Sequence, residues 1–195
     1  MTVIARTQSE AKSTKQSHRN CWEIASVEDS LAMTNYFLAD CCCSNPFIIS
    51  SSDLLAITKA CKDMSETRTG ALIILAAGND LNFYIKTGEQ LDAKVSANTL
   101  ESIFYKNSPL HDGAVIISNG KIRAARCVLP ITEREDFPSH LGMRHRAAAG
   151  ITEASDAIAI IVSEQTGEIS LCKGGHLENG IGAEKLKQRI EKEMI

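Results

Sequence analysis

Two uninterrupted apolar runs, Ala71–Ala77 and Ala157–Val162, place the strongest constraint on the fold. Each run has the length of one buried β-strand and falls far short of the roughly 20 apolar residues that a membrane-spanning helix needs. A strand that is apolar along its whole length must be covered on both of its faces. The two runs therefore predict a central sheet with helices packed on either side.

Short strand-like segments recur along the chain between these runs. Strands are predicted at Ala71–Leu75, Asn82–Ile85, Ala114–Ser118, Lys121–Leu129, Ala157–Ser163 and Glu168–Cys172. The dipeptide Asn119-Gly120 favours a type I′ turn, because both of its residues tolerate positive φ angles. It predicts that the strands on either side of it form a hairpin.

Helix-like segments alternate with the strands. Ser52 and Ser96 are predicted caps of two helices, since a serine side chain accepts a hydrogen bond from the free amides of the first turn. An alanine-rich helix is expected over 144–153, and Leu186 and Ile190 recur at helical spacing near the C-terminal end. The alternation predicts an α/β fold over 51–195, in which helices flank one mixed sheet.

The N-terminal part of the chain has a different composition. Residues 1–20 are rich in Ser, Thr, Gln and Lys and are expected to form a mobile tail. Residues 21–50 are expected to form a helical extension, in which Ser26 caps a helix that runs to Asp40. The tail has no apolar segment typical of a secretory signal, so a cytoplasmic location without a membrane is expected for the chain as given.

The overall charge limits the class of partner. The net charge of -3 argues against a nucleic-acid coat protein, because such a protein needs a basic surface to release counterions. No nucleic-acid partner is therefore expected, and any site for an anion must be local.

The seven cysteines form an odd set without a Cys-x-x-Cys pair. A structural zinc site usually has paired ligands two to four residues apart, and a disulfide framework usually has an even count. The pattern favours reduced thiols, several of them buried in the core.

Asp112 is the first candidate for chemistry, because it precedes Gly113 at the entrance to an apolar strand. The glycine permits a turn and lets a ligand approach the backbone, and an exposed carboxylate there can bind a divalent metal or accept a proton. The same pattern is compatible with a structural Asx-turn, in which Asp112 bonds its own backbone.

Arg144, His145 and Arg146 are predicted to lie in the first turn of the alanine-rich helix. Cations oppose the helix dipole there, and an anion that docks at this terminus would explain the two arginines. The alternative is a solvated basic turn whose partners are Glu133, Glu135 or Asp136. Ser163-Glu164 ends the second apolar run, where functional side chains emerge from a sheet, but taken alone the pair is better explained by an ordinary polar turn.

Together these motifs resemble the diadenylate cyclase domain, whose members are nucleotidyltransferases that make cyclic di-AMP from two ATP molecules. The resemblance covers approximately Asp53 to Cys172 and is closest to the soluble type whose N-terminal helices control oligomer assembly. It rests on Gly70–Ile74, Thr87-Gly88, Leu100–Phe104, Pro109–Ile117, Leu129-Pro130, Leu141–Ala148 and Val162–Gly167.

The resemblance implies a role for each matching residue. Asp112, Arg144 and Arg146 are implied catalytic residues. Asp112, Glu164 and His111 are implied ligands of Mg²⁺ or Mn²⁺. The implied substrate-binding residues are Gly113, Ala114, Leu129, Met143, Arg144, His145, Arg146 and Ser163. One domain holds one ATP, so the reaction implies a face-to-face dimer or a higher homo-oligomer.

Two positions depart from the family pattern. Met143 stands where the family usually has threonine, and Gln165 replaces the second acid after Ser163-Glu164. Met143 removes a hydroxyl that is expected beside the phosphates. It keeps open a second hypothesis, a catalytically weakened module that binds ATP or cyclic di-AMP and regulates a partner.

Overall fold

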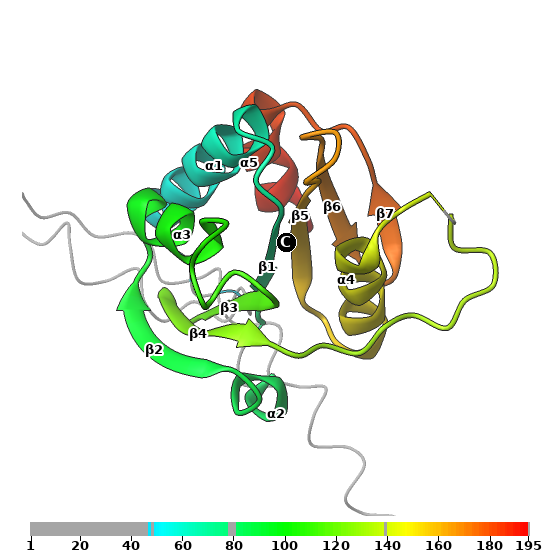
Figure 1. The fold of residues 1–195 in the computed structure, drawn as a ribbon, viewed down its shortest axis with the longest axis horizontal. Coiled ribbons are helices and arrows are strands. Elements are labelled where there is room, and N and C mark those ends of the chain that lie inside the picture. Colours follow the sequence, from blue (N-terminus) through cyan, green and yellow to red (C-terminus); the bar gives the residue numbers. More distant parts are fainter. Residues whose placement is uncertain (1–46, 48, 78–80, 139, 195) are drawn as a thin grey trace, which may run out of the picture. The chain divides into compact units, whose positions relative to one another are not determined.

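A seven-stranded mixed sheet, in the order β2-β4-β3-β1-β5-β6-β7, forms the centre of the fold (Figure 1). The structure is a computed structural model, and it describes Phe47 and residues 49–77, 81–138 and 140–194. The strands are β1 (Ala71–Leu75), β2 (Glu89–Lys94), β3 (Ala114–Ser118), β4 (Lys121–Cys127), β5 (Ile158–Val162), β6 (Ile169–Lys173) and β7 (His176–Glu178). The tail and the helix predicted at 26–40 lie outside the described residues.

The helices pack on both faces of this sheet. They are α1 (Ser51–Glu66), α2 (Asn82–Ile85), α3 (Ala97–Phe104), α4 (Met143–Ala154) and α5 (Ala183–Glu193). Helices α1, α3 and α5 share one face and α4 covers the other, which confirms the predicted α/β class (Figure 1). No helix in the ranges given above has both the length and the apolar character to span a bilayer.

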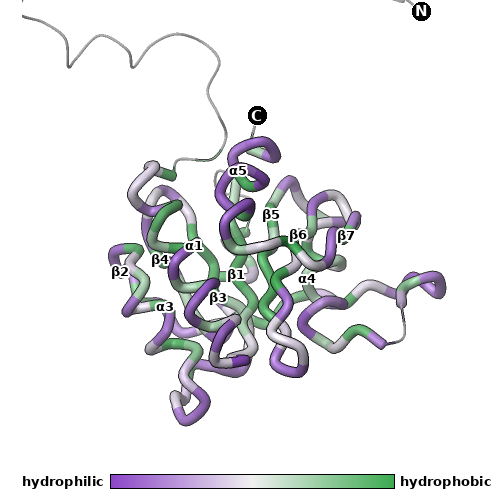
Figure 2. Tube along the Cα trace, turned by 90° about the horizontal axis from the view of Figure 1, so that it is seen from above, coloured by the Kyte–Doolittle hydropathy of each residue, from purple (hydrophilic) through white to green (hydrophobic). Residues whose placement is uncertain are grey.

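Strand β1 lies at the middle of the core. It pairs parallel with β3 and antiparallel with β5, and all five of its residues are buried. Ile73 and Leu75 pack toward α1, α3 and α5, whereas Leu72 and Ile74 pack toward α4. In Figure 2 the central strands are largely hydrophobic, and α5 is largely hydrophilic. The two apolar runs are thus covered on both faces, as predicted.

The predicted turn and cap signals are mostly correct. Asn119 and Gly120 have φ angles of 54° and 68°, which confirms the I′ hairpin between β3 and β4. Ser96 caps α3 through a bond from the Thr99 amide. The cap of α1 is Ser50, not Ser52, because Ser50 accepts from the Asp53 amide while the Asp53 carboxylate accepts from the Ser50 amide.

Other sequence predictions are wrong at particular elements. Asn82–Ile85 forms the short helix α2, since the Ile85 and Lys86 amides bond to carbonyls four residues earlier. A short, mostly apolar segment fits either a helix or a strand, so its pattern alone does not distinguish the two. The fourth predicted strand ends at Cys127, because the Val128 amide bonds to the Thr87 hydroxyl. The edge strands β2 and β7 were not predicted.

The cysteines that the structure describes are reduced and buried. Cys61, Cys127 and Cys172 are free thiols in the core. Burial raises the pKa of Cys61 to about 12 and that of Cys127 to about 11, so both stay protonated at neutral pH. The prediction of core thiols is confirmed for these three, and the remaining four lie outside the described residues.

Candidate active site

A cavity of about 1120 Å³ opens where β3 begins, where β4 and β5 end, and where α4 starts. Most of the sequence-predicted site residues meet in its wall. They are Asp112, Gly113, Ala114, Leu129, Met143, Arg144, His145, Ser163 and Glu164. His111 and Arg146 were predicted with them but are not part of this lining.

Asp112 reaches the cavity through a turn that only glycine completes. Gly113 has a φ angle of 134°, and a Cβ atom on it would lie 2.8 Å from the Arg126 backbone. The Asp112 side chain is exposed, and it forms no hydrogen bond or ion pair with any residue of the described ranges. The Asx-turn alternative is therefore not observed, and the carboxylate is available to a ligand.

Arg144 lies in the first turn of α4, after the N-cap Gly142. Its guanidinium donates to the Glu164 carboxylate, with 3.1 Å between Nη1 and Oε2. Gly70 makes room for this contact, because a Cβ atom there would lie 2.6 Å from Arg144 Nη1. The partner differs from those considered in the sequence, where Glu133, Glu135 and Asp136 were the nearest acids.

The other two residues of the basic motif have different surroundings. His145 is 7% exposed, and burial lowers its pKa, although the charge of Glu168 acts in the opposite direction. Its neutral imidazole lies in the cavity wall. The Arg146 guanidinium lies 5.7 Å from the centre of the Phe137 ring, in a cation–π arrangement.

Ser163 lies at the end of β5, where the chain turns toward β6. Its hydroxyl oxygen accepts a hydrogen bond from the Thr166 amide at 3.2 Å, and its carbonyl accepts from the Gly167 amide at 2.9 Å. These bonds fix the turn while they leave the hydroxyl proton free to donate to a bound anion.

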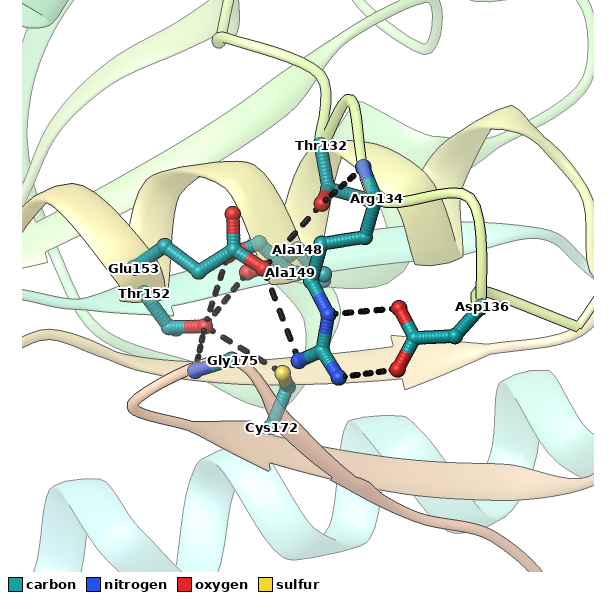
Figure 3. A network of polar contacts seen from close by, with 9 residues as sticks. All are labelled: Thr132, Arg134, Asp136, Ala148, Ala149, Thr152, Glu153, Cys172 and Gly175. Atoms are coloured by element: carbon teal, nitrogen blue, oxygen red, sulfur yellow. Dashed lines mark hydrogen bonds and ion pairs between the residues drawn. The ribbon is translucent and has the colours of Figure 1, made fainter.

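The segment between β4 and α4 supplies a further wall of the cavity through Leu129, Ile131, His140 and Leu141. A network of polar contacts holds it (Figure 3). Thr132 donates to Glu153 at 3.1 Å, and Arg134 forms two parallel bonds with Asp136 at 3.0 and 2.6 Å.

Gly150 lets the same segment approach α4 closely. A Cβ atom on Gly150 would lie 2.5 Å from the Pro130 carbonyl oxygen. The Thr132 amide also donates to the Arg146 carbonyl at 3.1 Å. The wall is thus fixed to α4 near its start, at its middle and at its end.

Arg126 is one of the lining residues that were not predicted from the sequence. It lies in β4, has a φ angle of 56° and is exposed. Arg126 falls inside a predicted strand, and the residue pattern of a strand does not reveal where its pairing is locally irregular. The sequence therefore did not indicate that this residue lines the cavity.

The His111 side chain forms a hydrogen bond with the protein backbone. Its Nδ1 lies 2.7 Å from the Ser108 carbonyl oxygen, so this nitrogen carries the proton and Nε2 is the free acceptor. No group of three or more metal-ligating side chains is found among the described residues.

Comparison with known proteins agrees with the geometry. The family model described as DAC, DisA bacterial checkpoint controller nucleotide-binding, matches residues 58–177. The cyclic di-AMP synthase CdaA of Bacillus subtilis (strain 168) is 48% identical over 138 residues, which are 71% of this chain and 50% of that protein. The diadenylate cyclase CdaS of Bacillus thuringiensis (strain BMB171) is 42% identical over 154 residues, 79% of this chain and 73% of that protein.

A solved structure shows the same fold. A crystal structure of a DacA double mutant from Staphylococcus aureus superposes with a TM-score of 0.71 at 40% identity, covering 74% of this chain and 96% of that one. This chain spans about half the length of CdaA and of the Listeria monocytogenes diadenylate cyclases. With a family match that includes both motifs and most of the cavity wall, the chain belongs to the DAC nucleotide-binding family.

Proposed function

We propose that this chain is a diadenylate cyclase, which condenses two ATP molecules into cyclic di-AMP and releases two pyrophosphates. The observation that carries the proposal is the meeting of the unpaired Asp112 carboxylate with Arg144 in one nucleotide-sized cavity of a DAC-family chain. Relatives named as diadenylate cyclases and cyclic di-AMP synthases support it.

The proposed reaction is an in-line displacement at phosphorus. The 3′-oxygen of one ATP forms a bond to the α-phosphorus of the other, and the bond from that phosphorus to the bridging oxygen of the β-phosphate breaks. Pyrophosphate leaves with the electron pair of that bond, and Asp112 is placed to accept the hydroxyl proton. The same step in the opposite direction closes the ring. Each cavity holds one ATP, so two copies of the chain must face each other.

The cavity wall suggests how the substrate is held. Arg144 and the Ser163 hydroxyl are assigned to the phosphate chain, because a guanidinium and a free O–H donor both bind phosphate oxygens well. The amides at the start of α4 add partial positive charge at the same position. Leu129 and its backbone are assigned to the adenine. Arg146 would have to leave Phe137 to reach a phosphate, so its role in catalysis stays a prediction.

The residues present fit a divalent metal. Mg²⁺ is usually held by one or two carboxylates together with substrate phosphates, and Mn²⁺ accepts the same oxygen ligands. Asp112 and Glu164 supply two carboxylates to the cavity, with His111 Nε2 as a further candidate. When bound, the metal neutralises charge that develops on the phosphates. Glu164 would then exchange its contact with Arg144 for the metal.

Incubation of the full chain with ATP and Mn²⁺, followed by chromatography, tests the proposal. Cyclic di-AMP is the expected product, its specific activity should rise with protein concentration, and GTP should give no cyclic product. Asp112→Asn should abolish the product while the melting temperature and the affinity for 3′-deoxy-ATP, which lacks the attacking hydroxyl, are retained. Asp156→Asn, an exposed carboxylate outside the cavity, is the matched control.

Met143 favours the regulatory binding module as a second candidate. Its side chain is 63% exposed at the rim of the cavity, where it offers the phosphates no hydroxyl. Binding of 3′-deoxy-ATP without any cyclic product would support this alternative. In that case Met143→Thr should restore product formation, whereas in an active enzyme it should only change the rate.

A further inference from the structure

Arg126 occupies an irregular position in β4. The register pairs Ala114 with Cys127 and Ile116 with Ala124, so β4 contains one more residue than β3 between these two pairs. This is a β-bulge, and Arg126 has the left-handed φ angle of 56° within it. Bulges redirect side chains, and a non-glycine residue in this conformation costs conformational free energy.

Arg126 is part of the cavity wall, and its side chain is exposed. Its backbone packs against Gly113, the residue that follows Asp112. Within the described part of the chain, the Arg126 side chain has no hydrogen-bonding or ion-pair partner. Arg123, three residues earlier in the same strand, instead pairs with Asp92 at 2.9 Å outside the cavity.

The charges of the cavity show what Arg126 would contribute. Among the described lining residues, the carboxylates are Glu89, Asp112, Glu164 and Glu168, and the only Arg or Lys side chains are Arg126 and Arg144. The charge of Arg144 is already engaged by Glu164. Arg126 is therefore the one arginine or lysine among the described lining residues whose charge is not engaged by a carboxylate.

We propose that Arg126 is a substrate-binding residue that contacts the phosphate chain of the nucleotide held in its own cavity. This inference rests on the proposed function for the identity of the ligand. A guanidinium binds phosphate oxygens through charge-assisted bonds, which explains why the chain tolerates an arginine where glycine would relieve the backbone.

The test measures binding of 3′-deoxy-ATP and of adenosine to the full chain. Arg126→Gln should weaken the affinity for 3′-deoxy-ATP by roughly tenfold or more, which is the size expected for a lost bond to a charged group. The affinity for adenosine, which has no phosphate, should not change. Arg126→Lys should recover part of the lost affinity, because it keeps the charge but not the two-pronged geometry.

Two further variants separate binding from folding. Arg126→Gly should raise the melting temperature, since glycine adopts the left-handed conformation without strain, and yet it should bind 3′-deoxy-ATP as weakly as Arg126→Gln does. Arg123→Gln is the matched control and should bind both ligands as the wild-type chain does.

Three results would overturn the proposal. Arg126→Gln could bind 3′-deoxy-ATP as tightly as the wild type does, or its affinity for adenosine could fall as much as its affinity for 3′-deoxy-ATP. Arg123→Gln could also weaken the binding of 3′-deoxy-ATP as much as Arg126→Gln does. A wild-type chain that does not bind 3′-deoxy-ATP would overturn both this inference and the proposed function. A selective loss in Arg126→Gln, with no cyclic di-AMP formed by the wild type, would overturn the proposed cyclase activity alone.

Discussion

The Arg144 guanidinium donates a hydrogen bond to the Glu164 carboxylate across space that the absent side chain of Gly70 leaves open. The three residues come from the start of α4, the turn after β5 and the residue before β1, so three separate parts of the chain determine one charge pair. In the proposed enzyme, the pair would control how much positive charge the cavity presents to a phosphate. Substitutions of Gly70 and of Glu164 test this role.

Gly70→Ala should displace the Arg144 side chain more than it disturbs the fold. The new Cβ atom would lie 2.6 Å from Nη1 and 2.9 Å from Cζ of Arg144, which are the mobile end of a long side chain. We expect a loss of about 1 kcal/mol in unfolding free energy, at the low end for over-packing. Product formation should fall by roughly 10- to 100-fold, because the proposed contact of Arg144 with phosphate would be misplaced.

Urea denaturation and the cyclase assay check this expectation together. Gly182→Ala is the control, because nothing lies within 4 Å of a Cβ atom there and the residue is outside the cavity. Activity of Gly70→Ala at the wild-type level would show that the position of Arg144 does not matter.

Glu164→Gln should separate the two roles of this carboxylate. The substitution removes a negative charge beside the phosphate site, so the affinity for ATP without metal should rise several-fold. If Glu164 also binds the metal, the Mn²⁺ concentration needed for half-maximal activity should increase. Metal titrations of the wild type and of Glu133→Gln, an exposed acid outside the cavity, provide the comparison. An unchanged metal requirement would remove Glu164 from the metal site.

The sequence predicted the parts of this site whose signals are local. The turn at Asp112-Gly113, the hairpin at Asn119-Gly120 and the helix start at Arg144 depend on a few adjacent residues. The Arg144–Glu164 pair depends on contacts between segments that are distant in the chain, so only adjacent acids were considered as partners in the alternative interpretation.

The edge strands β2 and β7 were not predicted, for a related reason. The β2 sequence Glu-Gln-Leu-Asp-Ala-Lys is mostly exposed, so its hydrophobic pattern is too weak to indicate a strand. Arg126 was missed because a bulge follows from the pairing of β4 with β3 and leaves no local signature. By contrast, β1 and β3 were predicted with the bounds that the structure has, since their side chains are buried along the whole length.

His145 should make stability depend on pH. Its pKa in the folded chain is lowered, mainly by burial, so the unfolded chain takes up a proton first as the pH falls. Stability should be unaffected at pH 7 and above and should decrease as the pH drops through about 6.5, the ordinary histidine value. The charges of His140 and Arg144 act in the same direction as burial, and that of Glu168 acts against it.

Melting temperatures between pH 8 and pH 5 measure this effect. In His145→Gln the decrease below pH 6.5 should be smaller than in the wild type. His176→Gln, which replaces an exposed histidine in β7, should keep the wild-type profile. Identical profiles for His145→Gln and the wild type would contradict the assignment.

Thr132 should hold the wall between β4 and α4 in place. The residue is 3% exposed, and its hydroxyl donates to Glu153 at 3.1 Å and accepts from the Arg134 amide at 3.3 Å. Thr132→Val keeps the shape but removes both bonds, and because water can solvate the exposed residues Glu153 and Arg134, each lost bond should cost only about 0.5–1.5 kcal/mol. Thr132→Ser retains the hydroxyl and should lose less stability.

Urea midpoints should rank wild type, Thr132→Ser and Thr132→Val in decreasing order, and hydrogen exchange over residues 131–142 should quicken in the valine variant. Slow exchange there in Thr132→Val would mean that the contacts of Gly150 with Pro130 alone fix this wall.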